Sequence, residues 1–181
     1  MVPARRAFLV LLLVATAQSG HAQVPDKFTN LRVLPKDIPR DSLLGIMRGF
    51  SLSLGVRCQY CHVGGDGVSF EGVEFAKDES LHKRRARFMM RMLDSLNGQV
   101  LPRVPGAEAS PFRMECKTCH RGIAQPLLLT QLLDRVRDSA GIDSAVARYR
   151  TLRQEDATAG RYDFGEWEMN LWAERLVSSG R

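Results

Sequence analysis

The chain has 181 residues, of which 25% are charged and 44% are hydrophobic, as in an ordinary globular protein and unlike a disordered tail. A net charge of +6 is too small to indicate a nucleic-acid binder, and no stretch interleaves aromatic with basic residues. The length suits one compact domain with an appendage.

Residues 1–22 have the features of a secretory signal peptide. Arg5 and Arg6 precede the uncharged apolar run AFLVLLLVATA, and small residues suited to cleavage follow at 15–17 and 20–22. The run is short for a membrane span, with an uncleaved N-terminal anchor as the alternative. We therefore expect export to the periplasm or the outer face of the cytoplasmic membrane, and removal of His21 with the signal.

The first helix is expected over about residues 41–54. Asp41 or Ser42 is suited to cap it, and Gly55 interrupts its pattern. Apolar residues recur every three or four positions and form one stripe with Met47 near its middle. The pentapeptide CQYCH follows at 58–62, and a glycine-rich loop without helical periodicity comes next.

A second helix is expected over about residues 78–97, with Gly98 ending it. Six residues share one face of this helix, and Met90 falls roughly opposite to them: Leu81, Arg85, Phe88, Met89, Met92 and Leu96. A loop then leads to a second pentapeptide, CKTCH at 116–120, which repeats the spacing of the first.

Three more helices are expected within residues 127–141, 143–154 and 164–177, and almost no strand. This tail weakly resembles a single helical hairpin of the tetratricopeptide kind. The expected fold class is therefore mainly α.

The two pentapeptides use all four cysteines and two of the four histidines. The pattern C-x-x-C-H is the attachment site of a c-type haem: two thiols form thioethers with the porphyrin, and the adjacent histidine binds the iron. We therefore expect two covalent haems, one on Cys58 and Cys61 with His62, the other on Cys116 and Cys119 with His120.

Three other roles for the cysteines are a redox dithiol, a zinc site and structural disulfides. A thioredoxin-like dithiol needs one C-x-x-C beside a βαβ pattern, which is missing here. A four-cysteine zinc site leaves both histidines without a role and needs a shorter gap between the pairs. Structural disulfides suit an exported protein but also leave the histidines unexplained.

A haem iron in an electron carrier usually has a second axial ligand, and a methionine sulfur favours the ferrous state. Met47, eleven residues before Cys58, is the candidate for the first haem. For the second haem, the candidate ligands are Met89, Met90, Met92 and His82. Helical phase disfavours Met90. The cationic segment 83–87 next to His82 favours an exposed position for this histidine.

Three stretches, MRGFSLSLGVRCQYCH, KRRARFMMRMLDSLN and FRMECKTCHRGIAQPL, resemble the cytochrome subunit of photosynthetic reaction centres and its small relatives. The resemblance covers about residues 40–128. In that family a helix, a turn and C-x-x-C-H serve each haem, and the sixth ligand is mostly a methionine on the preceding helix. The resemblance implies Met47 for the first haem. It implies Met89 for the second, eight residues before Asn97, with Met92 next.

The chain departs from the family pattern in three ways. The photosynthetic subunit is usually tetrahaem and built from two such halves, whereas this chain contains one. It lacks the lipid-bearing cysteine and adds a C-terminal helical hairpin. Docking to a reaction centre therefore does not follow from the resemblance.

Together these patterns predict a signal peptide (1–22), a dihaem cytochrome c domain of helix–turn–CxxCH modules (23–130) and a helical appendage (131–181). The expected function is one-electron transfer in a photosynthetic or respiratory chain, without enzymatic activity. The expected partners are redox proteins, including a membrane electron-transfer complex. Two alternatives stay open: a haem enzyme or ligand binder with an open sixth site at the second haem, and a haem-bearing interaction module.

Overall fold

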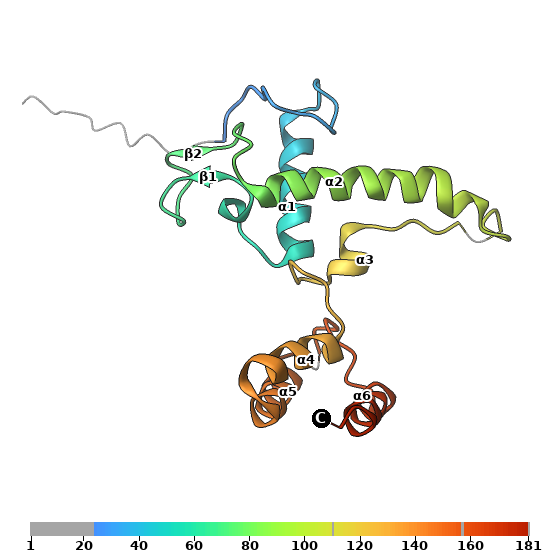
Figure 1. The fold of residues 1–181 in the computed structure, drawn as a ribbon. Helices are drawn as coiled ribbons and strands as arrows, with labels where there is room; N and C mark the ends of the chain where they lie inside the picture. Colours follow the sequence, from blue (N-terminus) through green and yellow to red (C-terminus); the bar gives the residue numbers. More distant parts are fainter. Residues whose placement is uncertain (1–23, 110, 157, 181) are drawn as a thin grey trace, which may run out of the picture.

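The computed structural model describes residues 24–109, 111–156 and 158–180, and the expected signal segment 1–22, with His21, lies outside them (Figure 1). The mainly α fold is confirmed. In chain order the elements are α1 (Arg40–Leu54), a 3₁₀ turn (Cys58–Tyr60), β1 (Val63–Gly64), β2 (Val73–Glu74), α2 (Leu81–Ser95), a π-helical turn (Leu96–Val100), a 3₁₀ turn (Leu101–Arg103), α3 (Cys116–His120), α4 (Leu129–Ala140), α5 (Ile142–Asp156) and α6 (Glu166–Ser178).

Helix α1 begins one residue earlier than expected and has no side-chain cap. Pro39 occupies the N-cap position with φ −58°, and its carbonyl accepts the first helical hydrogen bond, from Leu43 N at 3.0 Å. The prediction that Asp41 or Ser42 caps the helix is therefore wrong. Asp41 lies in the first turn instead, where its negative charge is favourable beside the helix dipole.

Helix α2 is capped by Ser80, whose hydroxyl accepts from the backbone N–H of Lys83 at 3.4 Å. Gly98 does not end the helical path, contrary to expectation. The backbone continues as a π-helical turn in which Leu101 N donates to Leu96 O, and a 3₁₀ turn follows. A glycine in a helical path costs stability without necessarily breaking it, and here the neighbouring turns continue the hydrogen bonding.

The two short strands close the glycine-rich loop after the first pentapeptide. They pair antiparallel, Val63 with Glu74 and Gly64 with Val73. Gly64 has φ +82°, and a Cβ there would lie 2.2 Å from a backbone oxygen of the opposing segment, so the tight turn requires glycine. The hairpin returns the chain to the pentapeptide and places Phe75 beside it.

The backbone after α1 touches the backbone after α3. Gly122 N donates to Ser53 O at 2.8 Å, and a Cβ on Gly55 would lie 2.1 Å from Gly122 O. Gly55 also ends α1 in the left-handed conformation, with φ +67°. The exit from the first helix and the exit from the second pentapeptide are thus held in contact.

The packed core lies in the C-terminal helices, which form a separate cluster in Figure 1. Helix α4 packs against α5 and α6, and the indole N–H of Trp172 on α6 donates to Asp134 on α4 at 2.9 Å. Five buried residues make up this core: Leu129, Leu133, Ala145, Leu152 and Trp172. Among the described residues before α4, Leu43 is the only apolar residue that is fully buried.

In the part of the chain that the structure describes, no helix has the length and apolar character required to cross a membrane.

The contact between the two glycines predicts that Gly55→Ala is strongly destabilising. The new Cβ meets a backbone oxygen and the left-handed φ is strained, so we expect a loss of about 2–3 kcal/mol in the free energy of unfolding. Thermal unfolding followed by circular dichroism measures it. Gly45→Ala is the matched control on the same helix, where a Cβ meets no atom within 4 Å, and it should be neutral or slightly stabilising. Equal effects of the two changes would contradict this assignment.

Candidate functional site

Each pentapeptide begins a short helical turn. In the first, Cys61 N and His62 N both bond to Cys58 O, at 3.1 and 2.9 Å. In the second, residues 116–120 form the single-turn helix α3, capped by reciprocal bonds between Glu115 and Thr118. The two cysteines of each motif thus lie about one helical turn apart.

Both pentapeptide histidines are held through the same ring nitrogen. Nδ1 of His62 lies 3.2 Å from Phe75 O, and Nδ1 of His120 lies 2.9 Å from Ile123 O. Because a carbonyl oxygen can only accept, Nδ1 carries the proton in both rings and Nε2 keeps its lone pair for a metal. A backbone carbonyl behind the ligating imidazole is the usual outer partner of a metal-binding histidine.

The surroundings of His62 favour the neutral imidazole that a metal requires. Burial lowers the pKa of His62 most, and the positive charges of Lys83 and Arg87 lower it further, whereas the bond to Phe75 O opposes this. A neutral ring with a fixed tautomer binds a metal without first losing a proton.

Burial also raises the pKa of two pentapeptide thiols, those of Cys61 and Cys116. Desolvation is the largest cause for both, and the partner cysteine of each motif adds to it. Burial therefore favours the neutral thiol over the thiolate at both positions.

A single cavity of about 1040 Å³ joins the two motifs. The N-terminal segment, α1 and α2 enclose it together with both pentapeptides. Its lining includes every residue predicted to hold a haem: Met47, Cys58, Cys61, His62, Met89, Cys116, Cys119 and His120. The structure therefore brings the predicted residues of both sites to one shared space.

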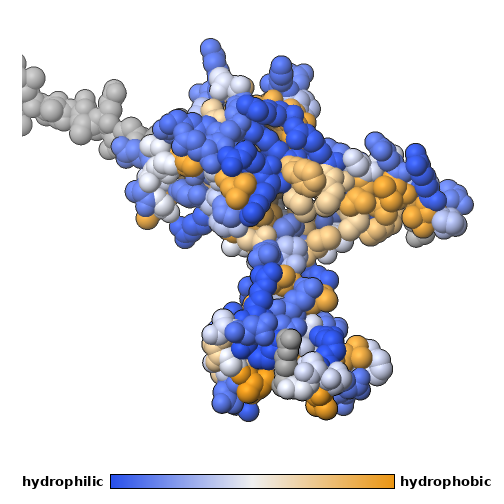
Figure 2. Space-filling view, in the orientation of Figure 1, coloured by the Kyte–Doolittle hydropathy of each residue, from blue (hydrophilic) through white to orange (hydrophobic). Residues whose placement is uncertain are grey.

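The cavity fits a large planar apolar group with acidic substituents. Its volume is at the upper end of the range for ligand sites, and many of the side chains that line it are apolar. On α2, Phe88 is 66% exposed and Met89 and Met92 are each 38% exposed. Figure 2 shows apolar side chains gathered over this helix. Cationic residues at the lining can pair with the carboxylates of such a group: Arg40, Arg48, Arg57 and Arg85.

The methionines of α2 are arranged differently from the helical-phase expectation. Met90, expected on the opposite side, also lines the cavity and is more buried than Met89 and Met92. The packed side of α2 is the one that carries Lys83 and Arg87, and Met90 follows Arg87 by one short turn. The sequence pattern missed this because the packed side is charged rather than apolar.

His82 lies at the first motif. Its ring stacks on Tyr60, with centroids 4.0 Å apart, and Tyr60 is one of the two spacer residues of that motif. The residue also lines the cavity. Its neighbours are therefore those of the first pentapeptide rather than the second.

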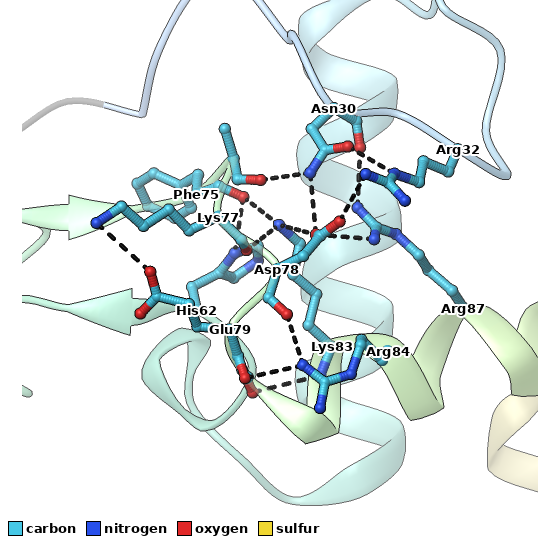
Figure 3. A network of polar contacts seen from close by, with 12 residues as sticks. Asn30, Arg32, His62, Phe75, Lys77, Asp78, Glu79, Lys83, Arg84 and Arg87 are labelled. Atoms are coloured by element: carbon cyan, nitrogen blue, oxygen red, sulfur yellow. Dashed lines mark hydrogen bonds and ion pairs between the residues drawn. The ribbon is translucent and has the colours of Figure 1, made fainter.

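The cationic run 83–87 is divided between the interior and the surface: Lys83 and Arg87 are packed against Asp78, whereas Arg84 and Arg85 are exposed. Asp78 accepts from Arg87 at 2.8 Å and from Lys83 at 3.2 Å (Figure 3). The hydrogen bond from Arg87 is the largest cause that holds the pKa of Asp78 well below its usual value. Arg32 and Asn30 complete the network, and Asn30 ties the N-terminal segment to it.

Asn97 has a structural role that the sequence did not reveal. Its side-chain amide donates to Met114 O at 2.9 Å, and its carbonyl oxygen accepts from Met114 N at 2.8 Å. This two-bond clamp fixes the segment that leads into the second pentapeptide against the end of α2. In the sequence, Asn97 is notable only as the position in the family pattern from which Met89 is counted.

The competing readings of the cysteines gain no support. All four cysteines are free thiols. Over residues 24–109, 111–156 and 158–180, no three His, Cys, Asp or Glu side chains gather as a metal site would require. The strands are two residues long and form no βαβ unit.

Comparison with protein families gives a match over residues 20–137, to the photosynthetic reaction centre cytochrome C subunit. The chain belongs to this family. It is accordingly a c-type cytochrome of electron transfer, a class that carries covalently bound haem. Searches of curated proteins and of solved structures gave no match.

Membership of this family also bears on the partners and the location of the protein. The cytochrome works with redox partners, and its family is membrane-associated and faces the periplasm. An electron carrier is the family's usual role, in preference to an enzyme.

The clamp predicts that Asn97→Ala loosens the second motif. Two hydrogen bonds to a partly buried backbone are lost, so the free energy of unfolding should fall by about 1–3 kcal/mol. Urea unfolding of the haem-loaded protein measures it. Asn170→Ala, the same change at an exposed position on α6, is the control and should stay within about 0.5 kcal/mol. An effect no larger than that of the control would show that the clamp is dispensable.

Proposed function

We propose that the protein is an exported dihaem c-type cytochrome that carries single electrons between redox proteins. The observation that supports this most is the pairing of two C-x-x-C-H turns on one cavity, each with its histidine fixed through Nδ1 to a backbone carbonyl. A single haem would leave one of these two equivalent arrangements without a purpose.

In this proposal each pair of thiols anchors one porphyrin. Cys58 and Cys61 hold the first and Cys116 and Cys119 the second, while His62 and His120 supply Nε2 to the irons. When bound, a haem iron alternates between Fe(III) and Fe(II) and so takes up or releases one electron. The chain's own task is to hold the rings, exclude water from them and keep both imidazoles neutral and oriented.

Met47 and Met89 are proposed as the second axial ligands. Met47 lies on α1 and Met89 on α2, and both line the cavity. A thioether ligand raises the reduction potential relative to a second histidine. Binding of one histidine and one methionine to each iron would leave no position for a substrate, so we propose a carrier and not an enzyme.

The location and organisation follow from the same reasoning. Export through the signal 1–22 places the cytochrome in the periplasm or at the outer membrane face, where its donor and acceptor are redox proteins of a photosynthetic or respiratory chain. We further propose two domains, a haem domain and a helical appendage. The proposed domains are residues 23–130 and 131–181, and the start of α4 at Leu129 lies near the proposed boundary.

Haem content tests the central proposal. The exported protein should gain the mass of two haems and show a c-type optical spectrum. Replacing Cys116 and Cys119 by Ala should remove one haem and leave the other. Replacing Ser178 and Ser179 by Ala, two exposed positions on the C-terminal helix, is the control and should remove neither. A colourless protein with zinc or with disulfides would refute the proposal.

Removal of a methionine ligand tests the axial assignment. In Met89→Ala the second iron should lose its sulfur ligand, so the methionine–iron charge-transfer band should fall by about half. The reduced protein should also bind carbon monoxide at that haem. Met92→Ala, one turn away and equally exposed, is the matched control and should retain the full band. The reverse result would assign Met92 instead.

A further inference from the structure

Lys83 is a buried lysine beside the first pentapeptide. Its residue exposure is 9%, and lysine is almost never buried to that extent unless its charge is paired. It lies in the first turn of α2, held there by the Ser80 cap, so its position is set by the start of the helix. The proposed function gives it no role.

All three donors of the Lys83 ammonium have acceptors. Nζ lies 2.8 Å from Phe75 O, 2.6 Å from Lys77 O and 3.2 Å from Asp78 Oδ1. An ammonium has three N–H groups, so this geometry satisfies each of them. The side chain is therefore fixed in one place, unlike a surface lysine.

One of these acceptors is shared with the histidine. Phe75 O accepts from Lys83 Nζ at 2.8 Å and from His62 Nδ1 at 3.2 Å, as Figure 3 shows. A carbonyl oxygen has two lone pairs and accepts both donors, but the charged donor forms the shorter and stronger bond and draws electron density from the oxygen. The oxygen is therefore a weaker acceptor for His62 Nδ1, whose bond is the longer of the two.

The second motif lacks this feature. His120 donates to Ile123 O at 2.9 Å, and in the described residues no side-chain donor other than His120 bonds that oxygen. The two imidazoles, otherwise alike, thus differ in the partner that stands behind them.

The charge near His62 is also net positive. Asp78 carries one negative charge, but it is shared among Lys83, Arg87 at 2.8 Å and Arg32 at 3.1 Å. Reduction of an iron adds one electron and lowers its charge by one, so a fixed positive charge nearby favours the reduced state. No bond forms or breaks in this step, and the electron comes from the donor protein.

From this geometry we infer that Lys83 is a positioning residue for His62 and raises the reduction potential at the first haem relative to the second. Both causes act in the same direction. A weaker hydrogen bond to Nδ1 makes the imidazole a poorer electron donor to the iron, and the ammonium charge stabilises Fe(II). The inference rests on the proposed function, since it needs a haem at each motif.

The test is spectroelectrochemistry of the haem-loaded protein. Lys83→Gln should lower the ratio of reduced to oxidised first haem at a fixed potential about tenfold, which is about 59 mV for one electron. For the second haem, the same ratio should change by less than about twofold. Met47→His, which lowers the potential of the haem it serves, assigns the two signals.

Lys77→Gln is the matched control. It removes one lysine charge six residues away, from an exposed side chain paired with Glu74 and Glu79, and it leaves the carbonyl behind His62 untouched. At a fixed potential, the ratio of reduced to oxidised haem should change by less than about twofold at either site. Lys83→Arg keeps the charge and should retain most of the wild-type potential.

A second variant, expected to shift the first potential in the opposite direction, keeps the inference testable if Lys83→Gln fails to take up haem. Asp78→Asn removes the negative charge beside Lys83, so the first potential should rise; a fall or no change would overturn the inference. A slower exchange of the His62 Nδ1 proton in Lys83→Gln, measured by NMR, would support the weakening of its bond to the carbonyl by Lys83.

The outcomes separate the two proposals. If both haems are present and Lys83→Gln moves the first potential no more than Lys77→Gln does, or moves both potentials equally, the role of Lys83 is refuted and the dihaem proposal stands. If the wild-type protein carries no haem, both fail together.

Discussion

The N-terminal part of this cytochrome is organised around an apolar cavity and not around packed side chains. Between residues 24 and 128 the fully buried apolar residue is Leu43, whereas five such residues pack together in the C-terminal helices. Burial of apolar surface is the main force that stabilises a fold, and a segment of about a hundred residues has little of it to spare. The stability of this part therefore depends on what fills the cavity.

Backbone contacts carry much of the remaining organisation. The hairpin β1–β2 brings Phe75 O to His62, the clamp of Asn97 fixes the approach to the second motif, and the contact between Gly55 and Gly122 joins the two halves. These contacts hold both imidazoles in one orientation through the chain's own hydrogen bonds. A side chain fixed in this way loses less conformational entropy when it binds a partner.

Much of this architecture follows from the sequence, and the parts that do not have identifiable physical causes. The helices around Met47 and Met89 are evident from periodicity, and the chemistry of the pentapeptides predicts which residues would attach haem. The burial of Lys83 is not evident, because its acceptors are backbone carbonyls placed by a hairpin of two-residue strands. Such strands leave no sequence period, and a run of basic residues resembles a solvated surface until its partners are known.

The cluster formed by α4, α5 and α6 has a consequence for how the protein folds. Its core, closed by the bond between Trp172 and Asp134, contains no residue of either pentapeptide and so requires no cofactor. The C-terminal helices can thus reach their final form on their own side chains, whereas the preceding hundred residues gain much of their buried apolar surface only when the cavity is filled.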